Sequence, residues 1–321
     1  MDPEQVHVVD IAMRLRFRGI ERRQAVVWKG PAGWAEWSPF LDYSGDEIVP
    51  WLHSAVEAAD HGWPTPVRAE IPVNCTIPVI DADRAAERAA ASGCRTAKVK
   101  VADPSSTPQQ DLDRVSAVRD ALGPSGRVRI DANGAWDVST ARERLEGFAH
   151  LGLEYAEQPV PTTEGLAELR VALARAGIDI PIAADESIRR SGDPERVKRL
   201  DAADVAVLKV QPLGGVRRCL ELAELLDMPV VVSSALETSV GLAAGVALAA
   251  ALPELPFDCG LNTLDLLDAD VTADAVRAES GVIPVHRPEA EDGRLAASAA
   301  DPDTTAWWKQ RLQDTARRIH G

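Results

Sequence analysis

The sequence predicts an α/β protein in which a (β/α)-barrel follows a smaller α+β unit. Three observations lead to this fold class. Short apolar runs that end in a polar residue recur 24 to 31 residues apart between Lys100 and Ser233. The segments between them are rich in Ala, Leu, Glu and Arg, which suits one helix per repeat. Residues 1–75 lack this repeat and carry strand and turn patterns instead.

Composition limits the classes of partner. The 321 residues exceed the usual size of one domain, so a large domain with a smaller one is expected. The net charge is −15, which argues against nucleic acid or an anionic membrane as partner, because both require a basic surface. The net charge says little about a small anionic substrate, which responds to the local field of the site, and a small-molecule carboxylate is the substrate we expect from the residues described below.

Cysteine usage and the N-terminus predict a cytoplasmic protein. The four cysteines lie far apart without a CxxC pair, which favours free thiols over a disulfide framework or a zinc site. No signal peptide is apparent at the start of the chain. No run of about 18 apolar residues is present, so no membrane span is expected.

Residues 1–75 are expected to form the α+β unit. The segments VHVVDIAMRLRF, RRQAVVWKG and GWAEWSPF predict three strands joined by turns, and Asp46–His61 predicts a helix. Five of the eight tryptophans lie here, which indicates core packing. Phe17–Arg23 is either an ordinary hairpin turn or a lid. The polar stretch at 286–321, which ends in a predicted helix over Thr305–Ile319, is expected to complete this unit.

Residues 76–285 are expected to form the barrel. Helices are predicted over Leu112–Leu122, Thr140–Leu151, Gly165–Ala176, Pro194–Leu200 and Val216–Leu225. The apolar runs end at Lys100, Asp131, Glu157, Asp185, Lys209 and Ser233–Ser234. One polar residue at the end of each successive parallel strand is the arrangement of a barrel active site.

The segment RVRIDANGAW shows why these polar ends point to chemistry. Residues at i, i+2 and i+4 of a strand share a face, so Arg129, Asp131 and Asn133 project together. A charged face on an apolar strand is unfavourable unless something compensates for it. A solvated turn at a capped strand end is the alternative for this segment alone, and the recurrence downstream favours a site.

Three carboxylates, Asp131, Glu157 and Asp185, would meet at one end of the barrel. Like charges that lie so close together require a cation between them or the protonation of one acid. Oxygen ligands without His or Cys nearby select Mg²⁺, with Mn²⁺ as a substitute, over zinc. The sequence therefore predicts a magnesium site.

Lysines flank the three acids in the chain. Lys98 and Lys100 share one face of a strand, and Lys209 follows the acids. A desolvated lysine near a divalent cation has a lowered pKa and can act as a general base. Two lysines on opposite sides of a metal-bound substrate suit abstraction of a proton α to a carboxylate, with the enediolate held by the metal. Structural salt bridges to the acids are the alternative.

These residues together resemble the enolase superfamily, in its muconate-lactonizing branch. The matching set in chain order is Lys98-x-Lys100, Asp131-x-Asn133, Glu157, Asp185-Glu186 and Lys209. The resemblance implies a modified TIM barrel, (β/α)₇β, with an α+β capping domain. It also implies that Asp131, Glu157 and Asp185 bind the metal and that Lys100 and Lys209 face opposite sides of the substrate. Lys98 would assist Lys100 or neutralise the substrate carboxylate, and Asn133 and Glu186 would orient the ligands and lysines.

Within the superfamily, the chain resembles the o-succinylbenzoate synthase family of actinobacterial type. The similar segments are RFRGIERRQAVVWKGPAGWAEWSPF, RIDANGAW and SSALETSVGLAAG. The resemblance implies Mg²⁺-dependent syn elimination of water from 2-succinyl-6-hydroxy-2,4-cyclohexadiene-1-carboxylate in menaquinone biosynthesis. Lys100 would take the α-proton and return it to the departing hydroxyl, while Lys209 stays protonated. Arg129, Ser234, Ser239 and the backbone around Gly260 are the expected substrate contacts.

Other activities stay open at this point. An N-acylamino-acid racemase or a dipeptide epimerase needs the same lysines and metal ligands, although SSALETS lacks the Asp-x-Asp typical of such epimerases. A metal-binding barrel without activity is a third possibility. Arg129 could instead pair with a carboxylate at the strand end, and Ser234 and Ser239 could be strand-end or helix-cap serines.

Overall fold

The computed structural model describes residues 5–17, 19–190 and 193–320. The N-terminal part, called the cap below, begins with an antiparallel sheet of β1 (His7–Phe17), β2 (Ile20–Gly30) and β3 (Gly33–Trp37) in that order. The helical segments η2 (Gly45–Ile48), α1 (Val49–Val56) and η3 (Glu57–His61) follow. The three predicted strands are confirmed, and the single predicted helix is three consecutive helical segments.

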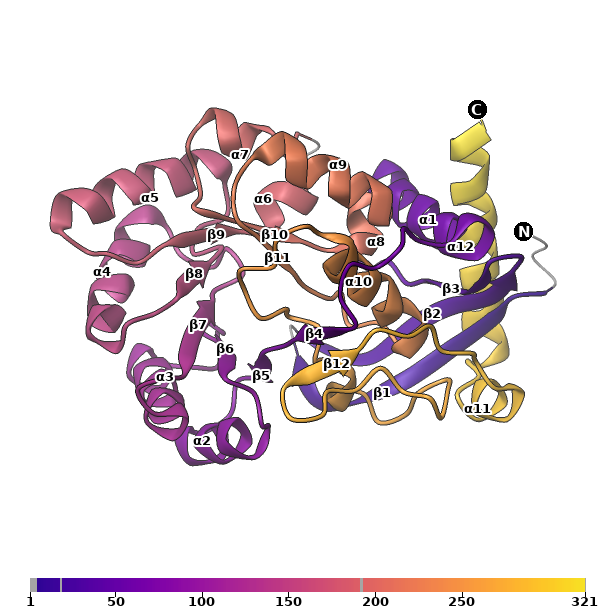
Figure 1. Cartoon of the computed structure of the whole chain (residues 1–321), viewed down its shortest axis with the longest axis horizontal. Helices are drawn as coiled ribbons and strands as arrows, with labels where there is room; N and C mark the ends of the chain where they lie inside the picture. Colours follow the sequence, from indigo (N-terminus) through magenta and orange to yellow (C-terminus); the bar gives the residue numbers. More distant parts are fainter. Residues whose placement is uncertain (1–4, 18, 191–192, 321) are drawn as a thin grey trace.

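Figure 1 shows the barrel beside the cap. Its seven-stranded sheet runs in chain order and is parallel throughout. The strands are β5 (Cys75–Ile77), β6 (Thr96–Lys100), β7 (Arg127–Asp131), β8 (Tyr155–Glu157), β9 (Ile182–Ala184), β10 (Val205–Leu208) and β11 (Val230–Val232).

A short segment closes the sheet into a ring. The Gly260 amide donates to the Val232 carbonyl at 2.8 Å, and the Cys259 amide donates to the Pro72 carbonyl at 2.7 Å. Parallel bridges join Ser233 to Gly260 and Val73 to Cys259. Residues 259–260 therefore act as the eighth strand, and the predicted (β/α)₇β barrel is confirmed.

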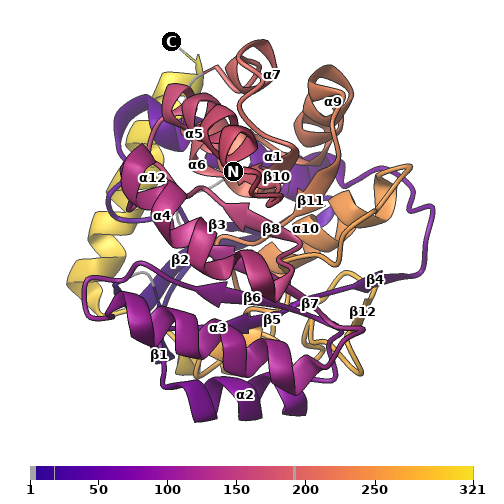
Figure 2. The ribbon, with the colours of Figure 1, turned by 90° about the vertical axis from the view of Figure 1, so that its left-hand side faces the viewer.

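Helices connect the strands, and Figures 1 and 2 show α2 to α5 on the outer side of the sheet. Thr107, Asp137 and Thr162 cap α3, α4 and α5 by accepting from the backbone amide three residues further on. The connecting helices are α2 (Ala82–Ala91), α3 (Pro108–Leu122), α4 (Val138–Phe148), η4 (Ala149–Leu151), α5 (Thr163–Ala176), α6 (Glu186–Arg189), α7 (Arg196–Arg199), α8 (Val210–Leu213), α9 (Val216–Leu226) and α10 (Ser239–Ala251).

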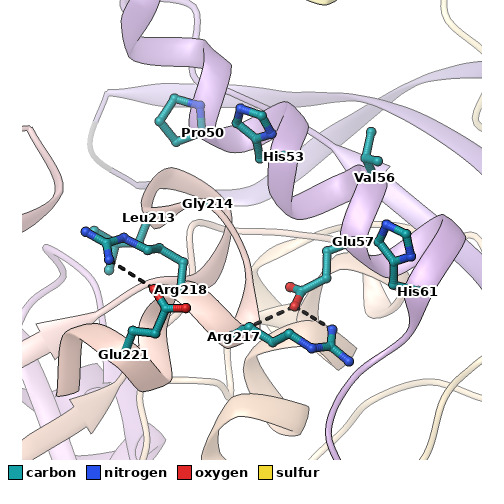
Figure 3. A pocket seen from close by; sticks show the side chains of 10 residues that line it. All are labelled: Pro50, His53, Val56, Glu57, His61, Leu213, Gly214, Arg217, Arg218 and Glu221. Atoms are coloured by element: carbon teal, nitrogen blue, oxygen red, sulfur yellow. Dashed lines mark hydrogen bonds and ion pairs between the residues drawn. The ribbon is translucent and has the colours of Figure 1, made fainter. Parts of the chain in front are cut away.

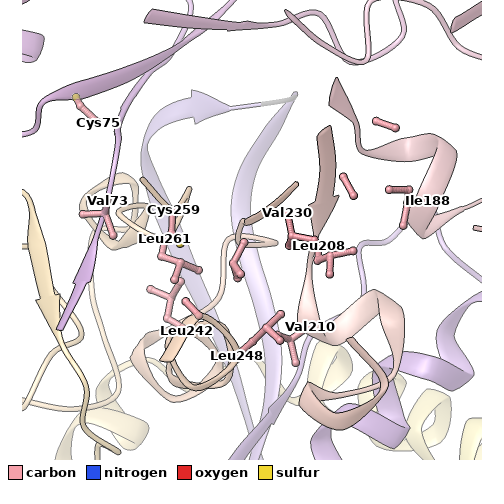
Figure 4. Close-up of a cluster of buried hydrophobic side chains, with 14 of the residues drawn as sticks. Val73, Cys75, Ile188, Leu208, Val210, Val230, Leu242, Leu248, Cys259 and Leu261 are labelled. Carbon is pink, nitrogen blue, oxygen red and sulfur yellow. The ribbon is translucent and has the colours of Figure 1, made fainter. Parts of the chain in front are cut away.

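Helix α10 was not predicted, because its sequence is apolar on every side. Its residues from Ser239 to Ala250 are all buried, which removes the amphipathic period that identifies a surface helix. Figure 4 shows Leu242 and Leu248 of this helix among Leu208, Val210 and Leu261. The helix therefore forms part of the core.

The C-terminal part returns to the cap. Strand β12 (Val282–Pro284) pairs with β4 (Glu70–Pro72), and η5 (Leu264–Leu266), α11 (Asp292–Ala297) and α12 (Pro302–His320) complete the fold. Figure 1 shows α12 against the cap sheet, and the Trp308 and Trp37 ring centroids lie 5.5 Å apart. The predicted C-terminal helix is confirmed, and the domain boundaries at 75 and 285 stay a prediction. Within the described chain, no helix is long and apolar enough to cross a membrane.

Candidate active site

Strands β6 to β10 bring the predicted polar residues to one end of the ring. The parallel register pairs Lys100 with Asp131 and Asp131 with Glu157, so these strand ends are level. The three lysines and three acids of the predicted site are each 7% exposed or less. Buried charges are strongly unfavourable unless they are paired, so their partners determine what this site can do.

Each acid lies next to a cation. Lys98 Nζ is 2.9 Å from Glu157 Oε2, Lys209 Nζ is 2.6 Å from Asp185 Oδ2, and Lys100 bonds to Asp131. Burial opposes the charge on Lys98, but Glu157 and Asp131 outweigh burial and raise its pKa. Burial also opposes ionisation of Asp131, yet Lys100 and Lys98 hold the pKa of that acid below its ordinary value. The site is therefore a compact charge cluster.

The order of the strands separates the two predicted catalytic lysines. Lys100 ends β6 and Lys209 follows β10, which are four strands apart in a ring that residues 259–260 close as the eighth. The two amines therefore start from opposite walls of the barrel. The carboxylates come from the three strands between them.

Oxygen ligands for a divalent cation are present in this cluster. Glu157 Oε1 is buried and finds no hydrogen-bond partner among the described residues. Burial, followed by the neighbouring Asp131, raises the pKa of Glu157, because its charge is disfavoured there. A hard cation would satisfy this oxygen and offset the acid–acid repulsion. The donor set therefore fits Mg²⁺ or Mn²⁺.

The three acids are each engaged by cationic side chains rather than grouped around one point. Among the residues that the structure describes, no group of three or more His, Cys, Asp or Glu side chains is placed to hold a metal ion. Asp131, Glu157 and Asp185 each bond to an ammonium or guanidinium group instead.

Asn133 and Glu186, which were predicted to orient the ligands and lysines, extend the cluster. Lys100 Nζ donates to Asn133 Oδ1 at 2.7 Å, and Asn133 Nδ2 donates to Glu186 Oε1 at 3.3 Å. Arg189, whose importance the sequence analysis missed, donates to Asp185 Oδ1 from Nε at 2.9 Å. It follows Asp185 by four residues on one short helix, and this i,i+4 spacing was the available signal.

Gln158 is a second residue that sequence reasoning missed. Its buried side chain accepts from the Asp185 amide at 3.0 Å and donates to Ser187 Oγ at 2.8 Å. It therefore ties the end of β8 to the backbone of the next acid. Its position directly after Glu157 was the only signal in the sequence.

A small pocket, called the substrate pocket below, lies beside the lysines and has a volume of about 30 Å³. The predicted residues Ser234 and Gly260 line it, and so does Phe17 of the predicted turn or lid, whereas Phe40 and Thr263 were not predicted to. Residue 260 must be small, because a Cβ there would lie 2.6 Å from Ser233 Oγ. Pockets for drug-sized ligands measure roughly 300 Å³ or more, so this pocket is narrow.

Strands β1 and β2 place Phe17 over the pocket. Phe17 pairs with Ile20 across the hairpin, and the Lys100 amine lies 5.0 Å from the Phe17 ring centroid. The predicted turn or lid at Phe17–Arg23 includes Arg18, which lies outside the described residues. Phe17 and Ile20, on either side of that turn, pair as in a hairpin.

Two predicted substrate contacts do not line the pocket. Ser239 Oγ donates to Asp270 at 2.5 Å and accepts from the Val276 amide. Arg129 is fully buried, and its guanidinium bonds to Glu154, Asn74 and the Asp258 carbonyl. The structure thus uses Ser239 at a helix start and Arg129 in ion pairing inside the barrel, as their alternative interpretations state.

A wider groove of about 820 Å³ lies apart from these residues, between α1–η3 of the cap and α8–α9 of the barrel. Figure 3 shows its side chains, with Glu57 bonded to Arg217 and Glu221 bonded to Arg218. These charges are paired near the surface, whereas the paired charges at the barrel mouth are buried.

The comparisons with known proteins identify the family. Residues 81–291 match the family model described as enolase C-terminal domain-like, and residues 8–59 match the model described as enolase N-terminal domain-like. This chain belongs to the enolase-like family. The resemblance expected from the sequence is confirmed.

This enolase-like chain is also similar to curated proteins named o-succinylbenzoate synthase. The protein from Thermobifida fusca (strain YX) is 55% identical over 302 residues, which cover 94% of this chain and 93% of that protein. The protein from Mycolicibacterium smegmatis is 47% identical and covers 96% and 94% of the two chains. The protein from Mycobacterium marinum is 47% identical over 313 residues, which cover 97% of this chain and 93% of that protein.

Solved structures share the fold at lower identity. Muconate lactonizing enzyme from Pseudomonas putida matches with a TM-score of 0.77 at 21% identity, over 92% of this chain and 98% of that one. The N-succinyl Arg/Lys racemase from Bacillus cereus matches with a TM-score of 0.76 at 18% identity, over 92% and 97%. At such identity, these matches show the enolase-like fold alone.

Proposed function

We propose that this chain is an o-succinylbenzoate synthase, a carbon–oxygen lyase of menaquinone biosynthesis that acts on 2-succinyl-6-hydroxy-2,4-cyclohexadiene-1-carboxylate. The observation that carries the proposal is the placement of Lys100 and Lys209 on opposite walls, with three acids between them. The curated relatives of that name, which match nearly end to end, support the substrate.

Lys100 performs both proton transfers. Its neutral amine takes the proton α to the carboxylate, and the electron pair moves into an enediolate. The enediolate then expels the hydroxyl from the neighbouring carbon, and the Lys100 ammonium returns the proton, so that water leaves and the ring becomes aromatic. One lysine suffices when hydrogen and hydroxyl depart from the same face, and Asn133 holds its amine at 2.7 Å.

Lys209 and Lys98 remain protonated. Lys209 stands on the opposite wall, where its positive charge faces the ring and stabilises the enediolate. Lys98 lies beside Glu157 and helps to neutralise the substrate carboxylate. Ser234 and Gly260, which line the pocket, are the proposed contacts of the succinyl group.

Asp131, Glu157 and Asp185 would hold Mg²⁺, or Mn²⁺ in its place. The bound cation would supply a Lewis acid that offsets the charge developing on the substrate carboxylate. Glu186 and Arg189 orient this set, because Arg189 bonds to both Asp185 and Glu186. The four cysteines are free and buried, which suits a cytoplasmic location.

A Mg²⁺-dependent absorbance assay with the cyclohexadiene carboxylate tests the function. We expect turnover in the wild type and a loss of about 10²-fold or more in Lys100→Ala and Lys209→Ala. Lys29→Ala, at a lysine whose side chain is 56% exposed, serves as the control. Absence of turnover, together with deuterium exchange at Cα of an N-succinylamino acid, would assign a racemase instead.

A further inference from the structure

A second buried charge cluster joins the cap to the barrel, and the proposed chemistry does not use it. Arg23 of β2, Glu36 of β3 and Glu237 before α10 are each 4% exposed or less. One cation and two acids in the interior are unfavourable unless their hydrogen bonds are satisfied. Their bonds reach residues 235–238 on the barrel side, and Ser38 and Gln24 on the cap side.

Arg23 contacts the pocket wall from behind. Its Nε donates to the Leu236 carbonyl at 3.0 Å and its Nη2 donates to the Ala235 carbonyl at 3.1 Å. The guanidinium carbon also lies 4.7 Å from the centroid of the Phe40 ring. Phe40, Ala235 and Leu236 all line the substrate pocket, so one side chain touches both the cap side and the barrel side of that pocket.

The two acids hold the same segment by its amides. Glu36 Oε2 accepts from the Thr238 amide at 3.0 Å and from Thr238 Oγ1 at 2.5 Å, and Glu237 Oε2 accepts from the Ala235 amide at 2.7 Å. A Cβ at Gly241 would lie 2.9 Å from Glu36 Cδ. The acids therefore fit closely against the start of α10.

The backbone of this segment needs such support. Leu236 has φ +64°, a left-handed conformation that is uncommon for a residue with a side chain. Such a conformation persists only where the surroundings hold it. The Arg23 bond to the Leu236 carbonyl and the Glu237 bond to the Ala235 amide act directly on this turn.

We propose that Arg23 is a positioning residue that shapes the substrate pocket by fixing Ala235, Leu236 and Phe40, while Glu36 and Glu237 hold the same segment by its amides. The proposal rests on the proposed function, because it assigns the wall to the substrate of that reaction. Arg23 contacts the wall from outside and leaves the proton transfers to the lysines. Its loss should therefore weaken substrate binding more than turnover.

Arg23→Lys and Glu36→Gln test the proposal, with Arg22→Lys as the matched control. Lysine keeps the charge but lacks the planar fork that reaches several carbonyls, whereas Arg22 is exposed and pairs with Asp10. We expect KM to rise about tenfold, which equals about 1.4 kcal/mol, with kcat changed much less and the control unaffected. An unchanged KM in both variants, or loss of kcat and thermal stability at constant KM, would overturn the proposal.

Amide hydrogen exchange separates this proposal from the function itself. In the absence of substrate, we expect faster exchange at residues 235–238 in Arg23→Lys than in Arg22→Lys, with similar exchange elsewhere. Equal exchange at 235–238 in the two variants would reject the positioning role. A wild type that does not turn over the cyclohexadiene carboxylate, but shows this localised difference, would reject the proposed function alone.

Discussion

At the scale of single residues, burial separates the charges at the barrel mouth from those elsewhere. Lys29 and Arg196 carry side chains that are more than half exposed and pair with exposed acids, and such pairs add little to stability. Lys98 and Lys209 are less than a tenth exposed. Removing either lysine would leave a buried acid without its counter-charge, so substitutions there should cost far more stability than at the surface pairs.

Glu157→Gln is expected to lose most of the stabilisation that Mg²⁺ provides. A ligand at one hundred times its Kd stabilises a protein by about 2.7 kcal/mol, and Glu157 Oε1 is buried with no hydrogen-bond partner among the described residues, so a cation would satisfy it. Thermal unfolding with Mg²⁺ and with EDTA measures the difference. The exposed Glu168→Gln is the control, and an equal Mg²⁺ effect in the two variants would argue against Glu157 as a ligand.

Glu237→Gln is expected to flatten the dependence of stability on pH. Burial, followed by the negative charge of Glu36, raises the pKa of Glu237 from 4.5 to about 7, although the nearby Arg23 lowers it in part. Because the folded protein holds this proton more tightly than the unfolded chain does, the stabilisation is full below pH 4.5 and is lost as pH rises through about 7.

Melting temperatures across that pH range measure this effect. The wild type should lose stability on the way to neutral pH, and Glu237→Gln should lose less of it. Glu254→Gln, at an exposed position, should follow the wild type. A Glu237→Gln profile as steep as that of the wild type would show that Glu237 does not carry the raised pKa.

At the scale of elements, helix starts depend on partners from distant segments. Helix α9 has Gly215 before it, and this residue offers no side-chain cap. Glu57 of η3 takes that role, with its two carboxylate oxygens accepting from the Val216 and Arg217 amides at 2.5 and 3.1 Å. A carboxylate at a helix N-terminus is favourable, so the cap stabilises a barrel helix.

Glu57→Ala is therefore expected to lower the free energy of unfolding by about 1 to 2 kcal/mol, the upper part of the range for a lost cap. Urea denaturation measures this loss. Glu221→Ala in the same groove is the control, because Glu221 is mostly exposed and pairs with Arg218 within α9. Equal losses in both variants would contradict the capping role of Glu57.

At the scale of the whole molecule, the C-terminal helix belongs to the core of the cap. Trp308 of α12 is fully buried against Trp37 and donates its indole N–H to Gln24 at 2.8 Å. Trp307, the preceding residue, is 50% exposed. Two adjacent tryptophans of one helix thus differ in burial and provide a matched pair.

Trp308→Ala is expected to lower the free energy of unfolding by about 3 to 5 kcal/mol, because it leaves a large cavity. Trp307→Ala should lower it by less than about 1 kcal/mol. Equilibrium urea unfolding of the two variants compares them directly. Similar losses would mean that α12 does not pack on the cap as the structure describes.

Much of the fold could be predicted because the period of the sequence reports local structure directly. Strand ends at Lys100, Asp131, Glu157, Asp185 and Lys209 recur at the spacing of a βα unit, and this spacing determined both the barrel and the candidate site. Parallel strands that follow each other in chain order place their ends at one rim. Helix α10 was missed because burial on all sides leaves no period to read.

Tertiary structure decided the roles of residues whose partners lie far away in the chain. Ser239 and Arg129 share the local pattern of site residues, yet Asp270 and Glu154 occupy their polar groups. Arg23 has no local signal, and it reaches the pocket wall only because β2 packs against residues 235–238. Period and spacing determine elements and their order, whereas contacts across the cap and the barrel depend on side-chain packing that no local pattern encodes.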